Sequence, residues 1–146
     1  MEDQDFKAVF LFDQSAEQVF NAVCNVRGWW SETLEGGSHK LNDEFIYRHG
    51  DIHYSKQKLT EVIPNKKVVW LVTDSELTFV ENKTEWTGTT ISFDIAEKSG
   101  KTQLIFAHHG LTPKFECYKA CFGGWTYYLE ESLVPLITTG KGNPDK

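Results

Sequence analysis

The chain has 146 residues, of which 40% are hydrophobic and 25% are charged, and its formal net charge is −6. A chain of this length forms one domain and buries roughly two-thirds of its unfolded surface, so it requires no disulfide or structural metal. Sequence-independent binding to DNA or RNA needs clustered Lys and Arg to displace counterions from phosphates. The acidic balance therefore argues against a nucleic-acid partner and against a membrane-surface role.

The cysteine content and the N-terminal residues favour the cytoplasm. The chain has three cysteines, an odd number, and Glu2, Asp3 and Asp5 stand where a secretory signal would carry an apolar run. The longest apolar run, around residues 67–73, is far shorter than the roughly 20 residues that span a bilayer. We therefore expect a cytoplasmic protein without membrane insertion.

The first predicted elements are a strand over residues 6–12 and a short helix. Ser15 and Gln18 have the spacing of a capping box, which marks the start of a helix. Its predicted buried stripe comprises Val19, Phe20, Val23 and Cys24.

A hairpin follows, and we predict that Gly50 and Asp51 form its two-residue turn. This register places Tyr47 opposite Tyr54 on the inward side of the sheet. The predicted inward face comprises Phe45, Tyr47, His49, Ile52 and Tyr54. The strand after the turn at 64–67 is continuously apolar, so alternation does not decide which side Trp70 faces.

The polar stretch 74–88 is predicted to be an irregular or short-strand connection, and a second hairpin follows it. We expect residues 97–100, EKSG, to form its turn. The predicted cross-strand pairs are Ile91 with Phe106 and Phe93 with Leu104, with His108 at the end of the same face.

The last predicted element is a long helix from about Thr112, with Pro113 at its first position, to Thr139, closed by Gly140. We expect Pro135 to kink it, because proline lacks the backbone donor. Its apolar stripe comprises Phe115, Tyr118, Phe122, Trp125, Leu129, Ser132 or Leu133, and Leu136. Gly123 and Gly124 lie within that stripe, where they either permit close backbone approach or leave room beneath the helix.

This order of elements indicates an α+β domain over residues 4–140, with helices on one face of an antiparallel sheet. We expect residues 141–146 to be a flexible tail.

Several segments are similar to one known family. GGWTYYLEESLVPLITTGKG is similar to the closing-helix signature GW-x-x-x-L-x-x-L of the activator of heat-shock-protein-90 ATPase homologue-like family. SAEQVFNAV resembles its capped first helix, RGWWS its tryptophan pair, LTEVIPNKKVVW its strand, proline turn and strand, and TQLIFAHHGL its last strand. The chain departs from the family at Ala16, where proline is frequent, at Pro135, and over residues 74–88.

The resemblance implies the helix-grip fold of the START-like, or SRPBCC, superfamily. In this fold a curved, seven-stranded antiparallel sheet wraps around a long C-terminal helix, with a short helix after the first strand. A cavity lies between the sheet and the C-terminal helix.

We expect no metal and no cofactor. His49 and His53 flank Asp51, but the predicted turn directs the two imidazoles to opposite faces, and adjacent His108 and His109 have the same defect. The helical pair Cys117 and Cys121 has no second pair beside it, so we interpret both as buried free thiols. No phosphate-binding glycine loop or nucleophile motif occurs in the sequence.

Large aromatic residues are the most informative candidates for a site. A cavity lined by rings with a few polar tips is typical of small-molecule binding. The predicted ligand-binding residues are Trp29, Trp30, Tyr47, Tyr54, Trp70, Phe93, Phe106, His108, Tyr118, Phe122, Trp125 and Leu129.

We favour a non-catalytic protein that binds a hydrophobic or aromatic small molecule in this cavity. One alternative is a cyclase-, dehydratase- or hydrolase-like enzyme that uses His108 as its acid–base group, because the wider superfamily includes such enzymes. Another alternative is a chaperone ATPase co-factor, which only the family's name suggests.

Overall fold

The computed structural model describes residues 6–49, 53–78, 84, 86–109 and 118–144. In this part of the chain, seven antiparallel strands form a sheet in the order β1-β7-β6-β5-β4-β3-β2. The strands are β1 (Phe6–Phe12), β2 (Glu35–Gly36), β3 (Glu44–His49), β4 (His53–Ile63), β5 (Lys67–Leu77), β6 (Thr90–Lys98) and β7 (Lys101–His109). The helical segments are α1 (Ala16–Cys24), α2 (Val26–Trp29), α3 (Tyr118–Tyr128), the π-helical η1 (Leu129–Leu133) and α4 (Val134–Thr139).

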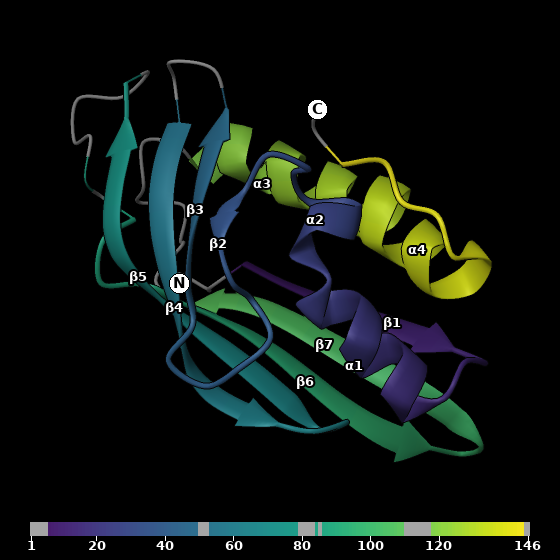
Figure 1. The fold of residues 1–146 in the computed structure, drawn as a ribbon. Helices are drawn as coiled ribbons and strands as arrows, with labels where there is room; N and C mark the ends of the chain where they lie inside the picture. Colours follow the sequence, from purple (N-terminus) through teal and green to yellow (C-terminus); the bar gives the residue numbers. More distant parts are fainter. Residues whose placement is uncertain (1–5, 50–52, 79–83, 85, 110–117, 145–146) are drawn as a thin grey trace, which may run out of the picture.

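The sheet curves around the C-terminal helical segments, as Figure 1 shows. α1 contacts β6, β7 and α4, while α2 contacts η1, so the helices share the concave side of the sheet. Strand β7 shows why this side must be covered: Leu104, Phe106 and His108 alternate along it and are fully buried. The predicted α+β class with a curved antiparallel sheet is confirmed.

The predicted first helix and its cap are confirmed in α1. The Gln18 backbone N–H donates to Ser15 Oγ at 3.1 Å, and the Ser15 backbone N–H donates to Gln18 Oε1 at 2.9 Å. Val19, Val23 and Cys24 are buried against the sheet. Burial raises the pKa of the Cys24 thiol to about 11, so this cysteine stays protonated.

The first hairpin is one residue out of the predicted register. Tyr47 pairs with Ser55, not with Tyr54, and residues 50–52 rather than two residues connect the strands. A slip of one residue turns each side chain of the partner strand to the other face. Tyr54 therefore lies on the convex face, where its hydroxyl donates to Asp74 Oδ2 at 3.3 Å.

The second hairpin is two residues out of the predicted register. Phe93 pairs with Phe106 rather than with Leu104. The turn consists of Ser99 and Gly100 alone, which have φ values of 54° and 81°. Two positive φ values are typical of the tight hairpin turn that matches the twist of its strands. The other predicted pair is displaced equally, because Ile91 pairs with His108.

Three local features differ from the expectations. Residues 74–77 continue β5 instead of starting an irregular connection. Val26–Trp29 forms the one-turn helix α2, and Glu35–Gly36 adds the short edge strand β2 beside β3. Trp70 on β5 is fully buried, so it faces the concave side.

The C-terminal helix changes its hydrogen-bond pattern before Pro135. The predicted start at Thr112 and Pro113 lies outside the described residues, and the predicted end is confirmed by left-handed Gly140. Between them, the Val134 backbone N–H donates to Leu129 O, five residues earlier, which is the pattern of a π-helix. The kink at Pro135 stays a prediction, and the π-helical segment η1 lies just before it in the helix.

Residues after Gly140 contact this segment. Pro135 has no N–H for the carbonyl oxygen of Glu131, and Asn143 Nδ2 donates to that oxygen at 2.5 Å. The Asn143 backbone N–H donates to Ser132 Oγ at 2.8 Å. The domain boundary at residue 140 and the flexible tail remain predictions, but Asn143 has defined hydrogen bonds to η1.

Candidate ligand-binding site

Aromatic side chains gather on the concave face of the sheet. The Trp30 ring stacks on Tyr47 with their centroids 4.2 Å apart, and it lies parallel to the Trp70 ring with their centroids 5.8 Å apart. Trp125 from α3 lies 5.1 Å from Trp30 and 4.8 Å from Phe106. These rings are in direct contact and fill the space between one another. We call the whole set the aromatic cluster; it comprises Trp29, Trp30, Phe45, Tyr47, Trp70, Trp86, Phe93, Phe106 and Trp125.

Trp29 and Trp30 both belong to this cluster, and they stand at the last position and the C-cap of the one-turn helix α2. Trp29 Nε1 donates to Val23 O at 3.2 Å, which fixes its indole beneath the end of α1. Ser132 Oγ donates to Trp29 O at 2.6 Å and ties α2 to the π-helical segment. Trp30 follows at the C-cap of α2, with its ring nearly parallel to that of Trp29 at 6.2 Å.

Trp86 belongs to the cluster but was not predicted. It lies in the connection between β5 and β6 and is 3% exposed. The centroid of its ring lies 4.7 Å from that of His53, 4.7 Å from that of His108 and 5.9 Å from that of Trp125. A tryptophan in an otherwise polar stretch was the available signal, because a ring of this size is seldom left in water.

His108 is held by hydrogen bonds at both ring nitrogens. Trp125 Nε1 donates to His108 Nδ1 at 3.1 Å, so Nδ1 carries no proton and the neutral ring carries its proton on Nε2. His108 Nε2 lies 2.8 Å from Thr89 Oγ1, which in turn donates to Trp86 O at 2.7 Å. Burial, with smaller contributions from His109 and His53, lowers the pKa of His108 to about 3. The ring is therefore neutral near pH 7.

Strand β4 places polar side chains beside the rings. Ser55 and Gln57 are fully buried, and Gln57 Nε2 donates to Ser55 Oγ at 2.6 Å. His53 Nε2 lies 3.2 Å from the same hydroxyl oxygen. Gln57 Oε1 and Trp70 Nε1 are buried and have no hydrogen-bond partner among the described residues. A concave face lined by apolar rings thus also carries two unsatisfied polar atoms.

Helix α3 has a half-buried position, Gly124, at which no described atom stands close to the backbone. Gly124 and Tyr128 are four residues apart and so lie on one face of the helix. That face is directed towards β3, because the hydroxyl oxygens of Tyr128 and Tyr47 lie 3.0 Å apart. A Cβ atom at half-buried Gly124 would have no described atom within 4 Å. Of the two roles expected for the glycines, this geometry favours room over close approach.

We call this position the Gly124 gap and define it by Gly124 and Tyr128 on α3 and by Tyr47 on β3, whose partner across the sheet is Ser55. It lies beside the aromatic cluster, where Tyr128 of α3 contacts Tyr47 of β3. Gly123 also has no described atom near its Cβ position, but it is exposed to solvent.

Most of the predicted ligand-binding residues share the concave side. The buried ones are Trp29, Trp30, Tyr47, Trp70, Phe93, Phe106, His108, Trp125 and Leu129. Tyr54 lies on the other face of the sheet. The side chains of Tyr118 and Phe122 lie outside the described residues.

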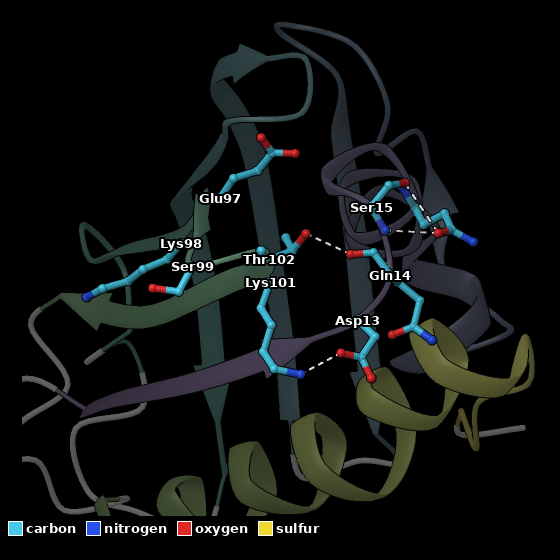
Figure 2. Close-up of a pocket in the computed structure, with 10 residues that line it drawn as sticks. Asp13, Gln14, Ser15, Glu97, Lys98, Ser99, Lys101 and Thr102 are labelled. Atoms are coloured by element: carbon cyan, nitrogen blue, oxygen red, sulfur yellow. Dashed lines mark hydrogen bonds and ion pairs between the residues drawn. The ribbon is translucent and has the colours of Figure 1, made fainter.

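A separate polar cleft of about 550 Å³ lies at the other end of β7 from His108, where α1 begins beside the β6–β7 turn (Figure 2). It is lined by Asp13, Gln14, Ser15, Gln18, Glu97, Lys98, Ser99, Gly100, Lys101 and Thr102. Lys101 forms an ion pair with Asp13 and lowers the pKa of that carboxyl group. Ser15 and Gln18 already cap the start of α1. The cleft offers no ring for an apolar ligand and has the character of a solvated surface.

The predicted turn, which placed His49 and His53 on opposite faces and so argued against zinc, is wrong. His49 pairs directly with His53 across the strands, so their positions share one face of the sheet. Within the described ranges, no three His, Cys, Asp or Glu residues are arranged to hold a metal ion. Cys117 lies outside those ranges, and the side chain of Cys121 is not described. Among the described helices, none is long and apolar enough to cross a membrane.

A seven-stranded sheet that grips a C-terminal helix over a buried aromatic face defines the helix-grip class of START-like proteins. The family model described as activator of Hsp90 ATPase homolog 1-like protein matches residues 13–137. The chain belongs to this family, and the resemblance found in its motifs is confirmed.

Solved structures with the same fold include three from bacteria. The Aha1 dimer from Colwellia psychrerythraea has a TM-score of 0.74 and 23% identity, covering 97% of this chain and 100% of that chain. Mll3558 from Rhizobium loti has a TM-score of 0.70 and 13% identity, covering 93% and 97% respectively. EF2215 from Enterococcus faecalis, a conserved protein of unknown function, has a TM-score of 0.65 and 18% identity, covering 100% and 82%. The search of curated proteins gave no match.

Proposed function

We propose that this chain is a cytoplasmic, non-catalytic protein that binds a hydrophobic or aromatic small molecule between the sheet and α3, at the Gly124 gap. The observation that carries the proposal is open space at a half-buried helix position directly beside a buried aromatic cluster. Concave sites lined by rings with a few polar groups are the usual setting for such ligands. The protonated, buried Cys24 thiol is compatible with a reducing compartment.

The surroundings of the gap support an aromatic ligand in particular. Trp30 and Tyr47 are stacked, so a planar molecule entering beside Tyr47 would extend an existing stack. The Tyr47 and Tyr128 hydroxyls and Ser55 supply polar groups at the rim, which can fix the orientation of a bound molecule.

The proposal is tested by a substitution on α3 that places a side chain in the Gly124 gap. We expect Gly124→Val to weaken binding at least about tenfold, because its methyl groups occupy the space that the ligand needs. Naphthalene and related uncharged aromatic compounds would be titrated into ¹⁵N-labelled protein while the indole N–H signals of Trp30 and Trp125 are followed.

Gly123→Val is the matched control, since it makes the same change one residue away on the exposed side of α3. It should leave binding within about twofold of the original protein. The proposal is contradicted if no compound shifts the indole signals, or if the two variants bind equally well.

A second candidate function is that of a chaperone ATPase co-factor. It is favoured by the family's description and by the similarity of the fold to the Aha1 structure. Adding the full chain to purified Hsp90 should then raise its ATPase rate above that of a buffer control. An unchanged rate together with no detectable complex would exclude this function.

A cavity enzyme that uses His108 has less support. A general acid or base must exchange a proton with its substrate, whereas both nitrogens of His108 are engaged by Trp125 and Thr89. The ring is also fully buried, and the low pKa of His108 keeps it unprotonated.

A further inference from the structure

Two buried polar atoms on adjacent strands lack a protein partner. Gln57 on β4 and Trp70 on β5 are both fully buried, and Gln57 Oε1 and Trp70 Nε1 make no hydrogen bond within the described residues. A buried donor or acceptor without a partner destabilises the folded state. Such atoms are uncommon in native proteins, and a bound water or ligand group is one way to satisfy them.

The register of the sheet brings these two side chains near one another. Gln57 pairs with Val72, and Trp70 pairs with Leu59, two residues further along β4. Gln57 and Trp70 are therefore diagonal neighbours on the concave face, a separation that long side chains bridge. One small group placed between them can reach both.

The chemistry of the two atoms defines that group. Gln57 Nε2 is used by Ser55, so the free end of the amide is an acceptor, while the Trp70 indole N–H is a donor only. A neutral hydroxyl donates to the first and accepts from the second. A carbonyl oxygen would satisfy only Trp70. An ion would lose its hydration among the rings of the aromatic cluster without gaining a charged partner there, which disfavours a charged group.

The same position is connected to the Gly124 gap. Gln57 is hydrogen-bonded to Ser55, which pairs across the sheet with Tyr47 at the rim of the gap. The rings of Trp30 and Tyr47 lie between Trp70 and that rim. The hydrogen-bonded pair Ser55 and Gln57 is therefore the route along which a ligand with an apolar ring body at the gap would direct a polar substituent towards Trp70.

We propose that Gln57 and Trp70 form the polar end of the ligand site, and that the bound molecule is a hydroxylated aromatic compound whose neutral hydroxyl donates to Gln57 Oε1 and accepts from Trp70 Nε1. This inference rests on the proposed function and specifies the class of its ligand.

The test compares two probes that differ by one hydroxyl, 2-naphthol and naphthalene. We expect the original protein to bind 2-naphthol about tenfold more tightly than naphthalene, with the largest change at the indole N–H signal of Trp70. Gln57→Leu should remove this preference by weakening 2-naphthol binding about tenfold while leaving naphthalene within about twofold. Trp70→Phe should do the same, and Gln57→Leu keeps the test decisive if the Trp70 variant does not fold.

Gln103→Leu is the matched control, because it makes the same substitution at a half-buried position on β7 that pairs with exposed Leu11. It should keep the preference for 2-naphthol. If both probes bind but Gln57→Leu leaves their ratio unchanged, the hydroxyl inference is overturned and the proposed function stands; the two atoms then bind water alone. If neither probe binds the original protein, both proposals fall.

Discussion

His108 shows how one side chain is fitted to a buried aromatic environment. Its neutral ring accepts from Trp125 and donates towards Thr89, so protonation would place a second donor against the indole N–H. The charged ring would also lose its hydration inside the domain. The folded state therefore requires the unprotonated form of His108.

This requirement predicts a pH dependence of stability. The pKa of His108 is lowered from 6.5 to about 3 on folding, so between these values the unfolded chain binds a proton that the folded chain does not. We expect the stabilising contribution of neutral His108 to the free energy of unfolding to be complete above pH 6.5 and to be lost as the pH falls towards 3. One such group changes the free energy of unfolding by at most about 1.4 kcal/mol per pH unit. Denaturant titrations across this range measure the slope.

His108→Asn is the control, because asparagine does not titrate and can still accept from Trp125. The variant should have a shallower slope than the original protein between pH 6.5 and about 3. His53 and His109, the other titrating groups that influence His108, are present in both proteins, so the difference reports His108. Equal slopes would show that His108 is not the group responsible.

At the scale of the element, the two hairpins show which errors in sequence reasoning change a site. The second hairpin was predicted two residues out of register, yet Phe93 and Phe106 still face inward, because side chains alternate with a period of two. The first was out by one residue, which moved Tyr54 to the convex face. Composition predicts a turn at Gly50 and Asp51 but does not fix how many residues separate the two strands.

The helices were predictable where the signal was local. The cap of α1 and the end of α4 at Gly140 each depend on a few neighbouring residues. The π-helical segment depends on contacts between distant residues: Pro135 removes a donor for Glu131 O, and Asn143 replaces it. No periodicity in the sequence contains that pairing.

The segment after Gly140 provides a prediction at this scale. A Cβ atom at Gly142 would lie 2.3 Å from Gly28 O and 3.0 Å from Ser132 O, both of them backbone atoms. We expect Gly142→Ala to lower the free energy of unfolding by about 1–3 kcal/mol, because α2 and η1 must move apart to admit the methyl group. Urea denaturation measures the loss. Lys141→Ala, at an exposed neighbour, should change it by less than about 0.5 kcal/mol. Equal stability of the two variants would mean that Gly142 does not pack against Gly28.

At the scale of the whole molecule, the sequence motifs were sufficient for the fold and for most of the aromatic cluster. Large rings at alternating strand positions and on one helix face have to meet wherever sheet and helix pack, so Tyr47, Phe106 and Trp125 could be predicted together. Alternation did not decide the side that Trp70 faces, although Trp70 packs parallel to Trp30 in the cluster. How tightly they pack was not predictable. The rings contact one another directly, and among the described residues the position without a close neighbour is Gly124, beside the cluster.

Because a ligand at this edge would bind the folded chain and not the unfolded chain, binding should stabilise the whole domain. At a concentration of 2-naphthol one hundred times its dissociation constant for the original protein, we expect the free energy of unfolding to rise by about 2.7 kcal/mol. Gly123→Val should be stabilised by the same amount. Gly124→Val should gain much less, since its methyl groups occupy the gap. Thermal unfolding with and without the compound measures these differences. Equal stabilisation of all three proteins would place the compound elsewhere on the surface, and the Gly124 gap would then not be the binding site.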